Sequence, residues 1–268
     1  MTFEQYIQNP MGVKSAVLTN RKMYQNMYEQ KWDAIRVREN GTIIYKLYKV
    51  KDKEDYYIHF KIPSEVVPKF YYDVIIRFYL IPGKSSNKGE PTLINYESQF
   101  YSNDPSFVYT FAHAFKENNL LIKDLEPKMS KLALKTKAEM RNPHDDIGYV
   151  KALYFAYLEM KKDRLFNKVI WNNNSVVYNK SIWNNTVTHA DDKVKDRQEK
   201  GEAIKKKEKA EQKKKKKESY GAANTKSVKS ANEMKKPDFS IKNIVFSIPK
   251  NLENSLGRVK TPFQKRKK

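Results

Sequence analysis

Histidines, acidic residues and glycine-rich turns are the parts of this sequence from which catalytic or metal chemistry would be built. The histidines are scattered, and only one stands beside carboxylates, in His144-Asp145-Asp146. A metal site is one interpretation of this trio, but two carboxylates at the start of a helix also complement the helix dipole, which is the simpler explanation. Gly83-Lys84-Ser85 resembles the end of a phosphate-binding P-loop, but Phe78 occupies the position of its first glycine.

Cysteine is absent, which excludes disulfides, thiolate metal sites and thiol nucleophiles. The sequence also lacks the GxSxG, HExxH and GxGxxG motifs. These observations predict a protein that is not an enzyme, that has no cofactor and that has no small-molecule substrate. An enzyme remains an alternative only because a site can be assembled from residues that lie far apart in the sequence.

Positive charge is concentrated near the end of the chain. Of the net charge of +22, residues 193–268 carry +16, from 25 Lys and Arg against 9 Asp and Glu. Such a segment favours polyanions through counterion release, and the alternative is a solvated spacer without a partner. The residues predicted to contact a polyanion are Lys213, Lys214, Lys215, Lys216, Lys217, Lys265, Arg266, Lys267 and Lys268.

A short repeat precedes this basic region. Ile170-Trp171-Asn172-Asn173 recurs as Ile182-Trp183-Asn184-Asn185. We interpret the segment as a two-stranded arm whose Trp171 and Trp183 are exposed for a partner protein. The alternative is a hairpin packed on its own body.

Apolar residues return beyond the charged region and predict a strand that ends at Pro249. This strand is expected either to fold back on its own body or to add to the sheet edge of a neighbouring subunit. Its predicted partner-binding residues are Phe239, Ile241, Ile244, Phe246 and Ile248.

The elements that would position these residues fall into six segments. They are an N-terminal helical segment (1–32), an antiparallel β section (33–102), a helical section of the same body (103–168), the Trp/Asn-rich arm (169–189), a charged helical or disordered spacer (190–236), and a strand with a basic tail (237–268). This order predicts an α+β fold, in which an antiparallel sheet, sandwich or barrel packs with three helices and an extended basic C-terminal arm follows.

Hairpin signals define the β section. Asn40-Gly41 is typical of a type I′ turn, because both residues tolerate a positive φ angle. The predicted strands are Ala34–Arg38, Thr42–Val50, Tyr56–Ile62, Tyr72–Ile81 and Thr92–Ser102.

Capping signals define the helices. Thr2 and Gln5 have capping-box spacing for a short first helix. Asp104-Pro105 predicts the start of a helix whose phenylalanines lie on the sheet. A second helix is expected over Pro127–Met140, with Met129, Leu132 and Ala133 facing inward, and a third from Asp145-Asp146.

Three segments resemble the structural proteins of large tailed bacteriophages that are found near head, neck and tail genes. They are residues 103–112 (NDPSFVYTFA), Arg141-Asn142-Pro143 and residues 151–156 (KALYFA). The resemblance covers roughly residues 95–160 and transfers no site residues. It implies a component of a virion or of its assembly.

The layout and this resemblance predict a non-enzymatic neck, head–tail connector or tail-completion subunit that binds neighbouring subunits through extended arms. Its expected partners are other virion proteins and copies of itself, with non-specific contact to nucleic acid as a further possibility. The expected location is the virion, after synthesis in the host cytoplasm. The sequence contains no run of about eighteen apolar residues, so no membrane span is predicted. The alternative function is that of a basic accessory protein whose Lys-rich tail contacts DNA or RNA.

Overall fold

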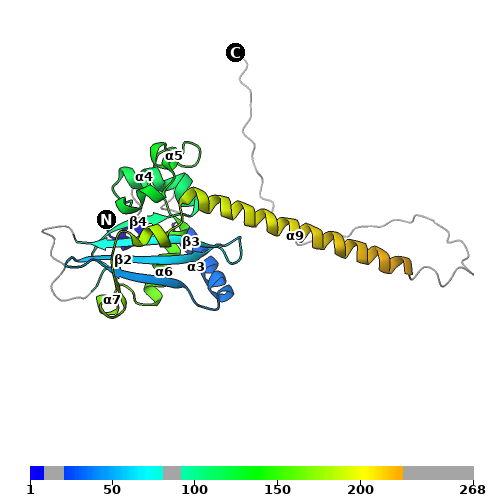
Figure 1. Cartoon of the computed structure of the whole chain (residues 1–268), viewed down its shortest axis with the longest axis horizontal. Coiled ribbons are helices and arrows are strands. Elements are labelled where there is room, and N and C mark those ends of the chain that lie inside the picture. Colours follow the sequence, from blue (N-terminus) through cyan, green and yellow to red (C-terminus); the bar gives the residue numbers. More distant parts are fainter. Residues whose placement is uncertain (9–20, 81–91, 226–268) are drawn as a thin grey trace, which may run out of the picture. The chain divides into compact units, whose positions relative to one another are not determined.

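The computed structural model describes residues 1–8, 21–80 and 92–225 and has an α+β fold (Figure 1). The chain divides into two units, Met1–Glu211 and Gln212–Lys268. The sheet and the helices that cover it belong to the first unit. The predicted fold class is confirmed, because a sheet in the N-terminal half packs with helices from both halves.

Five strands of the described residues form one sheet, in the order β4-β3-β2-β1-β5. Their bounds are β1 Ile44–Lys49, β2 Asp55–Pro63, β3 Tyr71–Tyr79, β4 Glu97–Ser102 and β5 Val176–Val177. The first four pair antiparallel, as predicted, but β5 pairs parallel with β1. The described strands therefore form one mixed sheet, and not a sandwich or a barrel.

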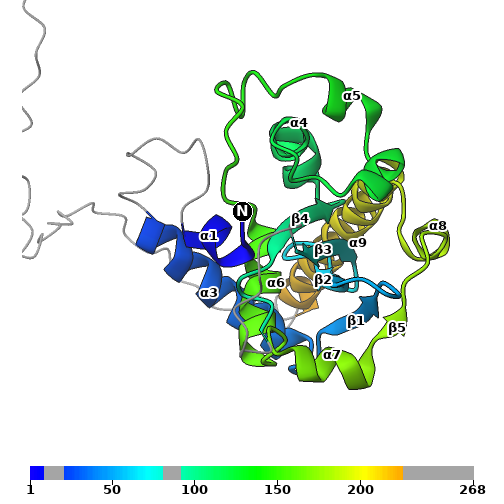
Figure 2. The same ribbon diagram turned by 90° about the vertical axis from the view of Figure 1, so that its left-hand side faces the viewer.

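The sheet is covered on both faces, which is why most residues of β2 and β3 are buried. Side chains of a strand alternate between the two faces. In β2, Tyr56 contacts the ring of Trp171, whereas the next residue, Tyr57, contacts the ring of Trp183. Figure 2 shows α3 and α6 on one side of the strands and α8 on the other.

Helices surround this sheet. Their bounds are α1 Phe3–Gln8, α3 Arg21–Arg38, the π-helix η1 Phe107–Phe111, α4 Ala112–Glu117, the 3-10 helix η2 Lys123–Lys128, α5 Lys131–Lys135, α6 Lys151–Lys162, α7 Lys168–Asn174, α8 Ile182–Thr186 and α9 Ala190–Thr225. Helix α6 packs on β2 and β3, and α3 packs on α6, where Trp32 stacks on Phe155 with 4.8 Å between ring centroids.

Two predicted helix starts are confirmed. At α1, the Thr2 amide donates to Gln5 Oε1 (2.9 Å) and the Gln5 amide donates to Thr2 Oγ1 (3.2 Å), which is a capping box. Before η1, Asp104 Oδ1 accepts a hydrogen bond from the Ser106 amide at 2.8 Å. Phe107 and Phe115 then bury their rings against each other and against the sheet.

The prediction of a strand at Ala34–Arg38 and a hairpin turn at Asn40-Gly41 is wrong. These residues form the end of α3 and its cap. Asn40 and Gly41 have φ angles of 53° and 74°, the Gly41 amide donates to the Arg36 carbonyl and the Asn40 amide donates to the Val37 carbonyl. This is a Schellman motif, which needs the same left-handed backbone as a type I′ turn, so the dipeptide alone does not distinguish the two.

The later helix predictions are also partly wrong. Pro127–Met140 contains the end of η2 and the short helix α5, and Leu132 is 72 % exposed, whereas Met129 and Ala133 are buried as expected. Asp145 has a φ angle of 55° and lies before α6, which begins only at Lys151.

Candidate functional site

The two tryptophans of the predicted arm are buried, so the expectation of exposed partner-binding side chains is wrong. Trp171 and Trp183 are 0 % and 1 % exposed. Trp171 Nε1 donates to the Leu165 carbonyl (2.7 Å), and Trp183 Nε1 donates to the Tyr178 hydroxyl (3.0 Å). The segment packs on its own body, as in the alternative interpretation, but it does so through α7, β5 and α8 and not as a two-stranded hairpin.

Most of the predicted tail contacts cannot be placed. The apolar residues Phe239, Ile241, Ile244, Phe246 and Ile248 and the basic residues Lys265, Arg266, Lys267 and Lys268 lie outside the described residues. Lys213, Lys214, Lys215 and Lys216 lie on α9 and are exposed, and Lys217 belongs to the same helix. The charged spacer therefore forms a helix of 36 residues, which agrees with the helical one of its two predicted states.

The beginning of α9 packs on the body, which the sequence did not indicate. Ala190 is buried, and the ammonium groups of Lys193 and Lys200 lie 4.5 and 5.2 Å from the ring centroid of Phe70. Ile204 packs against the small apolar cluster that contains Phe70. The helix has no apolar stripe, but the aliphatic stems of lysines cover apolar surface and their cations lie over the ring.

A buried polar network fixes the segment that leads into α9. Asp73, fully buried in β3, accepts hydrogen bonds from His59 Nε2 (2.8 Å), Asn103 Nδ2 (2.8 Å) and the ammonium of Lys61. Lys61 and Asn103 also donate to the carbonyl oxygens of Thr186 and Thr188, respectively. The network therefore joins the sheet to the chain between α8 and α9.

His59 in this network is a poor candidate for proton transfer to a ligand. It is 3 % exposed, and its ring lies against that of Trp183. Burial lowers the pKa of His59 in spite of the opposing attraction of Asp73. A neutral, enclosed imidazole beside a carboxylate with three donors suits a structural role.

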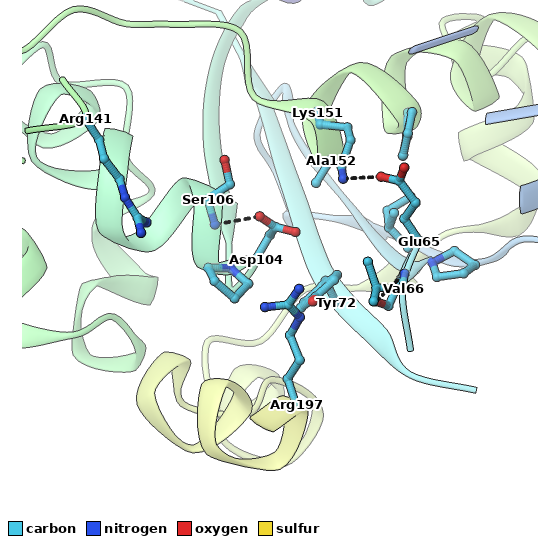
Figure 3. A pocket seen from close by; sticks show the side chains of 14 residues that line it. Glu65, Val66, Tyr72, Asp104, Ser106, Arg141, Lys151, Ala152 and Arg197 are labelled. Carbon is cyan, nitrogen blue, oxygen red and sulfur yellow. Dashed lines mark hydrogen bonds and ion pairs between the residues drawn. The ribbon is translucent and has the colours of Figure 1, made fainter. Parts of the chain in front are cut away.

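A cavity of about 240 Å³ is the best-formed candidate site among the described residues. It lies where the β2–β3 loop, the start of η1, the start of α6 and the first turns of α9 meet (Figure 3). The charged residues that line it are Glu65, Asp104, Arg141, Lys151 and Arg197. These residues come from five separate parts of the sequence, so only the fold brings them together.

The charges in the cavity are only partly neutralised by one another. Glu65 accepts from Lys151 (2.6 Å) inside the cavity and from Lys31 (2.9 Å), and these contacts lower its pKa. Among the described residues, no carboxylate lies within ion-pair distance of Arg141 or Arg197. The Nε atom of Arg197 is buried and has no hydrogen-bond partner there.

Asp104 forms part of the cavity wall and is 8 % exposed. Burial raises the pKa of its carboxyl group, although the Ser106 amide, Lys151 and Arg197 all favour the charged form. Tyr72 lies beside it, and burial raises the pKa of the Tyr72 hydroxyl to about 12. The cavity thus combines guanidinium donors with a carboxyl group that is reluctant to ionise.

Sequence reasoning considered Asp104 only as a helix cap and missed Arg141 and Arg197. One feature of the sequence could have indicated Arg197 as a contact residue, because it is the single arginine of α9 among many lysines. Arginine presents a planar set of donors that lysine lacks, so an isolated arginine in a lysine-rich segment is worth testing as a contact residue.

The remaining histidines do not form a metal site in the described part of the chain. His113 Nδ1 lies 2.6 Å from Asp145 Oδ2, but the described residues contain no group of three potential ligands. His144 is exposed beside this pair. As to membranes, no described helix combines the length and the apolar character that a spanning segment needs.

Comparison of the chain with family models, with curated proteins and with solved structures found no match. Function is therefore inferred from the arrangement of the chain's own residues.

Proposed function

We propose that this chain is a structural assembly protein of a tailed-phage particle, a neck, head–tail connector or tail-completion subunit. In this proposal the body docks among neighbouring subunits, and α9 with the segment beyond it makes a second attachment. The observation that carries the proposal is the division of α9. Its first turns contact the body at Phe70, whereas residues 209–216 are exposed.

A tethered second contact forms at a high effective concentration once the first is made, which suits a subunit that must join a large assembly.

The buried tryptophans change the expectation that residues 169–189 form a partner-binding arm. Because Trp171 and Trp183 belong to the core, the proposed attachment uses α9 and the residues C-terminal to it, and not the segment over 169–189.

Truncation after Glu211 tests this proposal, because it preserves every described contact between α9 and the body. We expect the truncated protein to fold but to be lost from purified particles, measured by its ratio to another particle protein in gels. The control is the full chain with Val177→Ala, an exposed position outside α9. Normal incorporation of the truncated protein would contradict the proposal.

A second candidate function is binding of nucleic acid, and the charge distribution of α9 favours it. Residues 190–203 carry four basic and five acidic residues, whereas residues 204–217 carry nine lysines and two glutamates. This second stretch has a net charge of +7 and spans about 21 Å at 1.5 Å per residue. Duplex DNA presents one phosphate charge per ~1.7 Å of axis, so the stretch matches several phosphates.

The dependence of DNA binding on salt tests this candidate. The logarithm of the binding constant should fall with the logarithm of salt concentration with a slope of about −0.9 per phosphate neutralised. Replacing Lys213–Lys217 by glutamine should make the slope shallower by up to about 4.5, and replacing the same residues by arginine should leave it unchanged. A slope that is the same for all three proteins would exclude these lysines as phosphate contacts.

A further inference from the structure

The cavity beside Asp104 has the composition of a binding site for a small oxyanion. Arg141 and Arg197 both line it, from the loop before α6 and from α9, and among the described residues neither lies within ion-pair distance of a carboxylate, although Asp104 attracts Arg197 from farther away. Figure 3 shows the guanidinium of Arg197 near the carboxyl group of Asp104 and the side chain of Arg141 on the far side of Ser106. Arginine is the side chain best suited to bind tetrahedral oxyanions, because its donors match two oxygens at once.

The size of the cavity limits the ligand. Its volume of about 240 Å³ is below the roughly 300–1,000 Å³ of sites for drug-sized molecules. It corresponds to about eight times the ~30 Å³ that a water molecule occupies in the liquid. This space holds one tetrahedral anion with a few waters.

Asp104 makes the site selective among anions. An ionised carboxylate repels an anion unless the anion carries a proton that lies between the two oxygens. Hydrogen phosphate carries such a proton and sulfate does not, although both have two negative charges at about pH 8. We propose that the cavity binds inorganic phosphate as a hydrogen-bearing oxyanion, with Arg197 as the donor to its oxygens and Asp104 as the acceptor of its O–H group.

The groups around Asp104 support this assignment, because they oppose the effect of burial and favour the ionised carboxylate that accepts the O–H group. The groups that face it are cations from α6 and α9 (Lys151 and Arg197), the hydroxyl of Tyr72 from β3 and the Ser106 amide. Lys151 is held by Glu65, so Arg197 is the nearest cation that remains available to a ligand. The proposal is independent of the proposed assembly function, because the cavity lies within the first unit and does not involve the lysines after Glu211.

Calorimetric titration of the full-length chain with phosphate and with sulfate at about pH 8 tests the proposal. The two anions have equal charge, so binding to the Lys-rich tail contributes equally to both, and a preference for phosphate reports the cavity. We expect saturable binding of one phosphate per chain and at least tenfold weaker binding of sulfate. Equal affinities for the two anions, or no phosphate binding at millimolar concentration, would overturn the proposal.

Three variants locate the binding. Arg197→Gln should weaken phosphate binding about tenfold or more, because it removes charge-assisted hydrogen bonds. Lys195→Gln removes the same charge from an exposed position of α9 and should leave the affinity unchanged. Asp104→Asn keeps a side-chain oxygen for the Ser106 amide but offers an amide donor to the anion, so sulfate should then bind as tightly as phosphate.

Circular dichroism and thermal unfolding establish that each variant is folded before the titrations are compared. Equal losses of affinity in Arg197→Gln and Lys195→Gln would show that only the overall charge matters and would refute a built site. Retention of the phosphate preference in Asp104→Asn would refute the role given to Asp104.

Discussion

Asp73 shows at the scale of one residue how this chain uses buried charge. The burial of Asp73 by itself raises the pKa of its carboxyl group, but the hydrogen bond from His59 and the cation of Lys61 outweigh burial and hold the pKa at about 2. Native Asp73 therefore stays ionised until the pH reaches about 2, whereas in an unfolded chain it takes up a proton near pH 4. Its contribution to stability is present above pH 4 and is lost as the pH falls from about 4 to 2.

His59 makes the free energy of unfolding depend on pH in a second range, at higher pH than Asp73. Burial keeps the pKa of His59 below the ~6.5 of an exposed histidine, so below this pH the unfolded chain binds a proton that the native protein does not. The free energy of unfolding should therefore fall as the pH decreases below about 6.5, by at most about 1.4 kcal/mol per pH unit for this one group. His59→Gln should flatten this dependence in urea unfolding measured across the pH range.

The matched control for His59 is His144→Gln, at an exposed position. It should leave the dependence on pH as it is in the unmodified chain. An equally steep fall in the His59→Gln protein would show that another group causes it.

Gly148 is a position where the close approach of a ring excludes any side chain. A Cβ atom built there would lie 2.3 Å from Phe111 Cε1. Gly148→Ala should lower the free energy of unfolding by about 1–3 kcal/mol, as overpacking does in other cores. Gly201→Ala in α9, where nothing lies within 4 Å, should be neutral or stabilising by up to about 1 kcal/mol. Equal effects of the two substitutions on urea unfolding would contradict the steric argument.

At the scale of the element, the structure differs most from the prediction in the segment from α7 to α8. Its repeated Ile-Trp-Asn-Asn residues form two short helices that bury one indole on each face of the sheet. Each indole nitrogen has a hydrogen-bond acceptor, as buried tryptophan requires. The segment therefore completes the core and leads the chain to α9.

Substitution of Trp171 distinguishes this core role from a partner-binding role. Trp171→Ala should lower the free energy of unfolding of the isolated protein by about 3–5 kcal/mol, because it removes a fully buried ring. Val177→Ala, at a neighbouring position that is 65 % exposed, should change it by less than about 0.5 kcal/mol. Urea unfolding measures both, and an unchanged stability in Trp171→Ala would argue against the buried position.

At the scale of the whole molecule, the core and the net charge lie in different parts of the chain. All residues of the two described apolar clusters precede Glu211. Residues 212–268 contain 17 Lys and Arg against 4 Asp and Glu, a net charge of +13. Stability and attraction to polyanions can therefore be changed separately.

Two truncations test this separation. Ending the chain after Glu211 should shift the thermal unfolding midpoint by less than about 3 °C, which corresponds to roughly 1 kcal/mol for a chain of this size. Ending it after His189 should lower the midpoint clearly, because Ala190, Lys193 and Ile204 then no longer cover the body. Equal midpoints for the two truncations would show that the start of α9 adds nothing to the fold.

Local patterns were enough to predict the features that depend on neighbours in the sequence. Backbone sterics and local hydrogen bonds made four features predictable, namely the capping box at Thr2, the cap at Asp104 and the central strands β2 and β3. They left open whether the charged segment is helical or disordered. The α+β class followed from their order along the chain.

Tertiary structure decided what each side chain meets. Asn40-Gly41 takes the same left-handed backbone in a hairpin turn and after a helix, so only the packing of α3 on α6 distinguishes the two. Trp171 and Trp183 have the same residue types whether a partner or the sheet covers them. Asp104, Arg141 and Arg197 share one cavity because four elements meet there, and no spacing in the sequence encodes that meeting.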